Sequence, residues 1–196
     1  MSQLPDKWAN ESNCDEVIYD TFVGRAVLNS AAGRAAGWDI AGAAAQLPGL
    51  RTVVNVMNTE RWYGAAEGGG SVRSAWAAHG VEYHWLPCKG GPGSGVPSDE
   101  QCGKVSLVLS EAMASGKTLI HCKSGRNRSS YCVFRWLLSL RKTAMESCSR
   151  VFRTRGLFVG HQEMFEDVVR RAGLRRGIRG PQPVSLTRAC LTAINN

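Results

Sequence analysis

Residues 118–130 have the sequence Thr-Leu-Ile-His-Cys-Lys-Ser-Gly-Arg-Asn-Arg-Ser-Ser, and this stretch decides the fold. Its first four residues predict a buried strand, and the residues after Gly125 predict the start of a helix. A loop that leads from a strand into a helix points unpaired backbone N–H groups at one place, and the helix dipole adds positive charge there. The stretch therefore predicts an anion site that suits a phosphate group.

Two side chains indicate that this anion site also carries out a reaction. Cys122 follows the strand, where backbone amides and nearby cations favour the thiolate, so we expect a nucleophile with a lowered pKa. After five intervening residues, Arg128 can bind two oxygens of a tetrahedral anion with its planar guanidinium. Gly125 permits a positive φ in the tight loop, and the Ser129 hydroxyl can donate to the sulfur when the thiolate leaves a covalent intermediate.

The pattern His-Cys-five residues-Arg-Ser resembles the signature loop of the cysteine-based protein tyrosine phosphatase superfamily. The surrounding sequence, from about residue 16 to residue 173, resembles the dual-specificity branch. The resemblance implies hydrolysis of phosphate monoesters through a cysteinyl-phosphate intermediate, with no metal and no other cofactor. It assigns catalysis to Cys122, Arg128 and Ser129. It assigns phosphate binding to the residues of the loop, which are Lys123, Ser124, Gly125, Arg126, Asn127 and Arg128.

The proton donor that the resemblance implies is missing from its usual place. That donor is an aspartate on a mobile loop just after the preceding strand, but residues 88–95 contain no carboxylate. Asp99, at the start of the next predicted helix, is either a displaced acid or a carboxylate held by the helix dipole, and we favour the second interpretation. His121 is interpreted as a hydrogen-bonding partner of the loop. We expect faster turnover of aryl than of alkyl phosphates, because an aryl leaving oxygen needs less protonation.

The hydrophobic pattern predicts an α/β fold with a central, mostly parallel sheet of about four to five strands flanked by helices. The run of β-branched residues at 50–56 is typical of a strand that is covered on both faces. The other predicted strands are residues 17–23, 81–86 and 117–121. Helices are predicted in the later half of 31–46 and over residues 71–79, 99–115, 132–140, 143–153 and 161–172.

Length and composition predict a single catalytic domain. With 196 residues and 43% hydrophobic content, the chain can bury one sizeable core. We expect a polar N-terminal segment at 1–15, the catalytic domain at 16–174, and a basic, flexible tail at 175–196. No apolar run has the length that crosses a bilayer, and the N-terminus has neither a secretory signal nor a transit peptide. We therefore expect a cytoplasmic protein, with the nucleus as the alternative.

The cysteine count bears on disulfides and metal sites, and the net charge bears on the kind of partner. Seven cysteines without a Cys-x-x-Cys pair indicate reduced thiols, and suggest neither a disulfide framework nor a metal site. The net charge of +8 favours an anionic partner, although a basic face that only aids solubility explains this charge at least as well. We expect a phosphorylated protein or an anionic phospholipid as substrate and no nucleic acid. The sequence carries no signal for an oligomeric state.

Three functions compete on these grounds. The first is a phosphatase for phosphotyrosine in proteins, with phosphoserine and phosphothreonine as further substrates. The second is a phospholipid or phosphoinositide phosphatase, because Lys123 and Arg126 make the loop unusually basic and similar to that of the mitochondrial phosphatidylglycerophosphate phosphatase. The third is a catalytically weak or inactive module that only binds phosphate, because the usual acid is not found.

Overall fold

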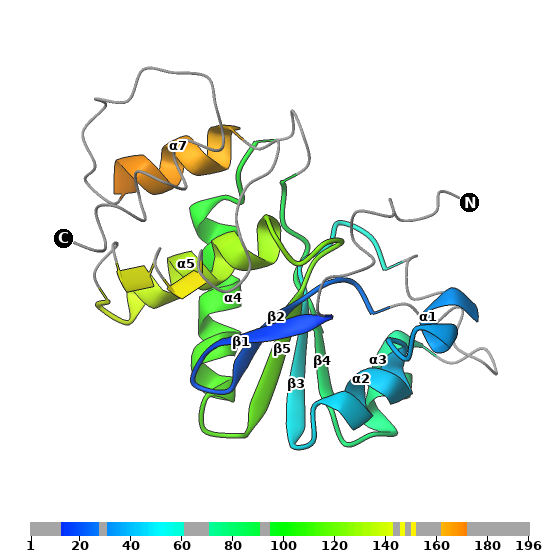
Figure 1. Ribbon diagram of the computed structural model, residues 1–196. Coiled ribbons are helices and arrows are strands. Elements are labelled where there is room, and N and C mark those ends of the chain that lie inside the picture. Colours follow the sequence, from blue (N-terminus) through cyan, green and yellow to red (C-terminus); the bar gives the residue numbers. More distant parts are fainter. Residues whose placement is uncertain are drawn as a thin grey trace.

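The computed structural model describes a compact set of segments between residues 13 and 171. The described residues are 13–27, 31–60, 71–90, 95–142, 146–147, 150–151 and 162–171. They form the α/β architecture that the hydrophobic pattern predicts, with a five-stranded sheet between two groups of helices (Figure 1).

The sheet has the strand order β1-β2-β5-β3-β4 and is parallel except at one edge. The strands are β1 (Cys14–Ile18), β2 (Thr21–Gly24), β3 (Leu50–Asn55), β4 (Glu82–Trp85) and β5 (Lys117–His121). Only the pair β1 and β2 is antiparallel among the pairs described. β5 has the predicted bounds and lies in the centre, so the backbone that leads out of it at Cys122 is flanked by a strand on each side.

The prediction of one strand over residues 17–23 is wrong, because the segment contains a tight turn. Tyr19 and Asp20 have φ angles of 49° and 54°. They form a turn between the end of β1 at Ile18 and the start of β2 at Thr21. A two-residue hairpin of this kind needs positive φ at both central residues, because that twist matches the flanking strands. Aspartate is found in this conformation more often than other non-glycine residues, but tyrosine is not. The turn therefore leaves only a weak local signal.

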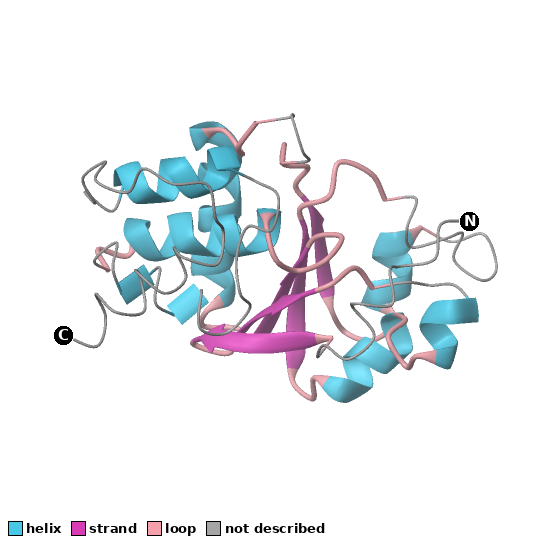
Figure 2. Cartoon of the chain, turned by 45° about the horizontal axis from the view of Figure 1, so that its top comes forward, coloured by secondary structure: helices cyan, strands magenta, loops and turns pink. Residues whose placement is uncertain are grey.

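Helices lie on both sides of the sheet (Figure 2). On one side are α1 (Ala31–Ala35), α2 (Ile40–Gln46) and α3 (Val72–Ala77), and on the other are α4 (Asp99–Ala112), α5 (Arg128–Ser139) and α7 (Gln162–Arg171). α4 and α5 pack against each other and against the central strand β5. The largest side chains of the core are fully buried and come from both layers: Trp38, Trp76, Tyr131, Phe134 and Trp136.

The helix that begins at Asp99 starts where the sequence predicts. Ser98 and Gln101 form a capping box, in which the Ser98 hydroxyl accepts from the Gln101 N–H at 3.2 Å and the Gln101 side chain accepts from the Ser98 N–H at 3.0 Å. The predicted helix in the later half of 31–46 corresponds to α2. Its start is fixed by Asp39, whose carboxylate accepts from the Gly42 N–H at 2.8 Å.

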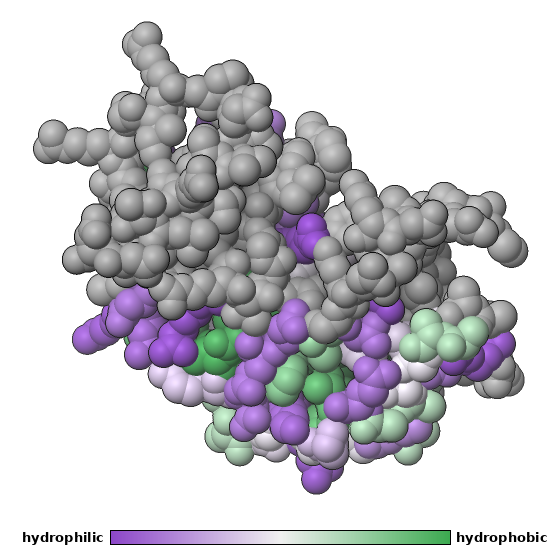
Figure 3. Space-filling view, viewed as in Figure 1, coloured by the Kyte–Doolittle hydropathy of each residue, from purple (hydrophilic) through white to green (hydrophobic). Residues whose placement is uncertain are grey.

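On the face seen in Figure 3, the described residues form a mixture of hydrophilic and hydrophobic surface. Its exposed large hydrophobic side chains are scattered over different elements: Tyr19, Trp85, Leu107 and Met113. Of the helices described, none is both long enough and apolar enough to cross a membrane.

Residues 143–145 of the predicted capping box, and the predicted tail at 175–196, lie outside the described residues. The predicted domain bounds stay predictions.

Candidate active site

The loop at residues 122–127 connects the central strand to α5, as the sequence predicts. Two backbone hydrogen bonds brace it from neighbouring segments. The Val56 N–H donates to the His121 carbonyl at 3.0 Å, and the Ala26 N–H donates to the Lys123 carbonyl at 3.1 Å. The entry into the loop is therefore held by the segments that follow β3 and β2, which limits how far the loop can shift.

The shape of the loop directs backbone N–H groups at the sulfur of Cys122. Gly125 has φ of +68°, the conformation for which glycine is the favoured residue. The Ser130 hydroxyl donates to the Gly125 carbonyl at 3.3 Å and so ties the loop to the first turn of α5. The N–H groups of Gly125 and Ser129 both hydrogen-bond to the Cys122 sulfur. This is the arrangement of donors that a bound anion requires.

Cys122 lies at the bottom of this loop, where the balance of charges favours its thiolate. The sulfur is buried, with 2% of the residue exposed, and its distance to the Ser129 hydroxyl oxygen is 3.3 Å. Burial raises the pKa of Cys122, but the Arg128 guanidinium, the Ser129 hydroxyl and the two N–H groups outweigh it and lower the pKa below the usual value. The lowered pKa raises the fraction of Cys122 that is thiolate, the reactive form of a cysteine, relative to an ordinary thiol at the same pH.

The remaining predicted phosphate-binding residues follow in the same loop. Lys123 is exposed, whereas Arg126, Asn127 and Arg128 are partly buried. Arg128 is also the first residue of α5, so its guanidinium and the positive end of the helix dipole act at the same place. The loop brings together the residues predicted from the sequence, from Cys122 to Ser129, within a single turn and the start of a single helix.

His121 is a buried, neutral member of the site. The pKa of His121 is lowered to about 3 because burial disfavours its charged form, although a hydrogen bond with the Cys122 backbone acts in the opposite direction. The imidazole is therefore uncharged at neutral pH and has no extra proton to give. This agrees with the interpretation of His121 as a hydrogen-bonding partner of the loop.

Asp99 is held by two guanidinium groups. Its carboxylate accepts from Arg135 on α5 at 2.7 Å and from Arg171 on α7 at 3.0 Å, while 76% of its side chain remains exposed. The hydrogen bond to Arg135, with the charges of both arginines, lowers the pKa of Asp99 below its usual value. A general acid must carry its proton at the working pH, and these contacts further disfavour the protonated form of Asp99. The geometry supports the structural interpretation of Asp99.

Asp167 is a buried partner that the sequence analysis missed. Only 7% of its side chain is exposed, and the carboxylate accepts from the Tyr131 hydroxyl, from Arg170 and from Arg171, whose Nε lies 2.6 Å away. Burial, followed by the hydrogen bond to Asp167, raises the pKa of Tyr131 to about 12. Because Arg171 also reaches Asp99, these contacts join α7 to α4 and α5. Only the amphipathic pattern of residues 161–172 was visible in the sequence.

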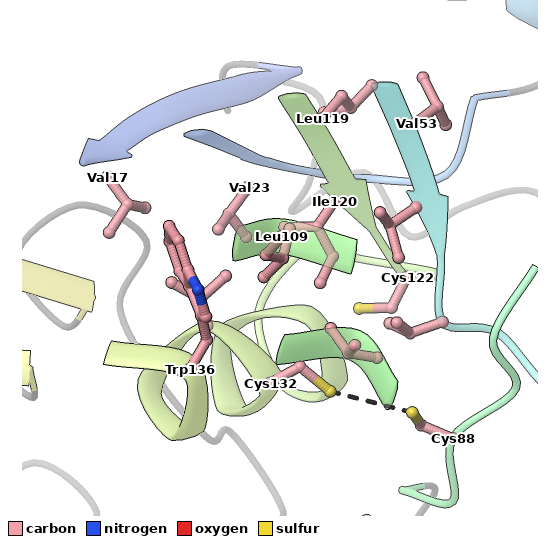
Figure 4. Close-up of a cluster of buried hydrophobic side chains, with 14 of the residues drawn as sticks. Val17, Val23, Val53, Cys88, Leu109, Leu119, Ile120, Cys122, Cys132 and Trp136 are labelled. Carbon is pink, nitrogen blue, oxygen red and sulfur yellow. Dashed lines mark hydrogen bonds between the residues drawn. The ribbon is translucent and has the colours of Figure 1, made fainter. Parts of the chain in front are cut away.

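Two further thiols, those of Cys88 and Cys132, lie near Cys122 (Figure 4). The sulfur atoms of Cys88, in the segment after β4, and Cys132, on α5, are 3.9 Å apart. Hydrogen bonds to Cys102 and Cys88, together with burial, raise the pKa of Cys132 well above the usual value. Cys88, Cys102, Cys122 and Cys132 are free thiols in the part of the chain that the structure describes.

Comparisons with known proteins support the fold. No protein-family model matches the sequence, and no curated protein matches it. Among solved structures, Tk-PTP in its active form is 22% identical, with a TM-score of 0.58 over 83% of this chain and 98% of its own. PTPMT1 in complex with PI(5)P is 19% identical, with a TM-score of 0.57 over 82% and 99%. Human DUSP28 is 18% identical, with a TM-score of 0.54 over 83% and 95%.

The chain therefore has the fold of the cysteine-based protein tyrosine phosphatases and of their dual-specificity branch. This confirms the fold that the signature loop predicts. At these identities the likeness concerns the path of the backbone alone.

Proposed function

We propose that this protein hydrolyses phosphate monoesters through a cysteinyl-phosphate intermediate, with phosphotyrosine in proteins as the preferred substrate. The observation that carries the proposal is the set of contacts around Cys122: a thiolate-favouring sulfur, the N–H groups of Gly125 and Ser129, and the guanidinium of Arg128 at one place. The fold also supports the general activity, that of a cysteine-dependent phosphatase.

The first step transfers the phosphoryl group to the protein. The Cys122 thiolate attacks phosphorus, the bond between phosphorus and the leaving oxygen breaks, and the sulfur–phosphorus bond forms. Arg128 and the loop N–H groups bind the equatorial oxygens and stabilise the charge on them. In the second step water attacks phosphorus, inorganic phosphate leaves, and the Ser129 hydroxyl stabilises the departing thiolate by donating to it.

The state of Asp99 supports phosphotyrosine as the preferred substrate. A carboxylate held ionised by Arg135 and Arg171 cannot protonate a leaving oxygen. A phenolate with a pKa of about 10 leaves without that help far better than an alkoxide does. The enzyme should therefore act faster on phosphotyrosine than on phosphoserine or phosphothreonine.

Two measurements test this proposal. Hydrolysis of an aryl phosphate should fall by about four orders of magnitude or more in Cys122→Ser, because the nucleophile is lost. Across a series of aryl phosphates, kcat/KM should fall steeply as the pKa of the leaving phenol rises. Undetectable hydrolysis by the unaltered protein, with phosphate binding retained, would leave the third function, a phosphate-binding module, in its place.

A phospholipid or phosphoinositide substrate is the second candidate. The observation that favours it is the row of cations in one loop, in which Lys123 is exposed beside the partly buried Arg126 and Arg128. Several cations suit a head group with more than one phosphate. PTPMT1, which shares the fold, was solved in complex with PI(5)P. The two substrate classes separate in one assay of phosphate release from phosphotyrosine peptides and from vesicles that contain phosphoinositides or phosphatidylglycerophosphate.

A further inference from the structure

The aliphatic part of the Arg128 side chain contacts two segments that are far from it in the sequence. A Cβ atom built on Gly90 would lie 2.5 Å from Arg128 Cγ, 3.1 Å from Arg128 Cδ and 2.5 Å from Met164 Cε. No side chain fits at residue 90 without moving one of these groups. The backbone of Gly90 therefore packs directly on the stem of Arg128, and Met164 packs beside it.

The segment that contains Gly90 is itself fixed to the rest of the fold. The Cys88 N–H donates to the Val56 carbonyl at 3.2 Å, so the segment is bonded to the residue that also braces the end of β5. The Gln101 side chain donates to the Pro87 carbonyl at 2.9 Å. Pro87 and Cys88, which precede Gly90 closely, are thus held from two sides.

Met164 is fixed by the helix that carries it. It is fully buried, and it lies one turn before Asp167, which binds α7 to Tyr131 on α5. Arg171, at the end of the same helix, reaches Asp99 at the start of α4. The contact of Met164 with Gly90 therefore rests on an element that is tied to both neighbouring helices.

We propose that Gly90 and Met164 are positioning residues that hold the Arg128 side chain in the conformation in which its guanidinium binds the substrate's phosphate group. The proposal deepens the proposed function and rests on it. A free arginine side chain samples many rotamers, and confinement of its stem within the folded protein lowers the entropy cost of phosphate binding. In this proposal both residues act through Arg128.

The direct test is Gly90→Ala, with vanadate as the probe of the anion site. We expect its affinity, measured by calorimetry, to fall about tenfold, because the added methyl group displaces the stem of Arg128. The pH profile of the alkylation of Cys122 by iodoacetamide should move to higher pH, because a displaced guanidinium stabilises the thiolate less. Gly49→Ala is the control: Gly49 also has a positive φ, +86° against +137° at Gly90, so both substitutions strain the backbone, but a Cβ at residue 49 meets nothing within 4 Å.

A double-mutant cycle with Arg128→Ala separates positioning from a general loss of structure. When Arg128 is absent, Gly90→Ala should lower vanadate affinity by less than about twofold further. An equal loss with and without Arg128 would overturn the proposal. Met164→Ala serves as the second variant in the same cycle, with the same expectation, if Gly90→Ala does not fold.

The cycle also distinguishes the two levels of the argument. If Arg128→Ala alone leaves vanadate affinity unchanged, the proposed function of the loop fails. If Arg128→Ala weakens binding while Gly90→Ala and Met164→Ala do not, the proposed function stands and the positioning role is overturned.

Discussion

The two sides of the candidate site are encoded in different ways. On one side, residues 122–129 are contiguous, and the proposed nucleophile, the N–H donors and the guanidinium all come from one loop and one helix start. On the other side, Gly90 and Met164 come from separate segments and meet only at the stem of Arg128. A short motif can therefore specify reactive groups, whereas the orientation of their side chains depends on the tertiary fold.

The largest effect that bears on this comparison is expected from Arg128→Lys. Lysine keeps the positive charge but cannot bind two oxygens through a planar fork, so kcat/KM for an aryl phosphate should fall about 100- to 1,000-fold. Steady-state kinetics measure the loss, with the unfolding midpoint as a check on the fold. A decrease of less than about tenfold would mean that charge alone suffices and that the aim of this side chain matters little.

The next effect tests the contacts that hold α7, the helix that carries Met164. Asp167→Asn removes a buried charge that faces Arg170 and Arg171, so the free energy of unfolding at pH 7 should fall by about 3 kcal/mol. Because the pKa of Asp167 is lowered in the folded protein, its stabilisation is present above the unfolded pKa and is lost as the pH falls through the folded one. Urea unfolding at pH 7 and at pH 3 should therefore show a smaller difference between the two proteins at pH 3.

A smaller effect is expected from the buried histidine on the loop side. The folded pKa of about 3 lies below the ordinary value of 6.5, so the unfolded chain binds a proton first as the pH falls. Stability should therefore decrease below pH 6.5, by about 1 kcal/mol between pH 7 and pH 5.5. In His121→Gln this decrease should be smaller, whereas His79→Gln, at an exposed position, serves as the control. Equal slopes in all three proteins would argue against a buried neutral imidazole.

The smallest effect is expected from Asp99→Ala. The side chain is largely exposed and ionised, so turnover of an aryl phosphate should stay within about twofold of the unaltered protein. Initial-rate measurements with an aryl and an alkyl phosphate check this. A decrease of about a hundredfold would identify Asp99 as the general acid and would join α4 to the catalytic side of the site.

The sequence predicted what depends on neighbours along the chain. The strand at 117–121, the loop and the cap at Ser98 follow from local periodicity, glycine placement and capping chemistry, and the structure has them at those positions. The hairpin turn at residues 19–20 was missed because it places a tyrosine in a conformation that tyrosine rarely adopts.

The rest could not be read from the chain because it depends on distance in space. Nothing in the residues around Gly90 says that a helix some seventy positions later packs against it. In the same way, Asp167 looks like any acidic residue on an amphipathic helix until Tyr131 and Arg171 surround it. Such contacts are fixed by how helices dock, and docking has no local pattern.

The central place of β5 has a consequence for how the protein matures. Thr118 pairs with Thr21 on one side and with Thr52 on the other, so the sheet cannot close until the ribosome has made the chain beyond residue 121. Such long-range pairing folds slowly. The lowered pKa of Cys122 arises from that closure, so the nascent chain carries a cysteine of ordinary pKa, and the larger thiolate fraction of Cys122 appears only when folding is complete.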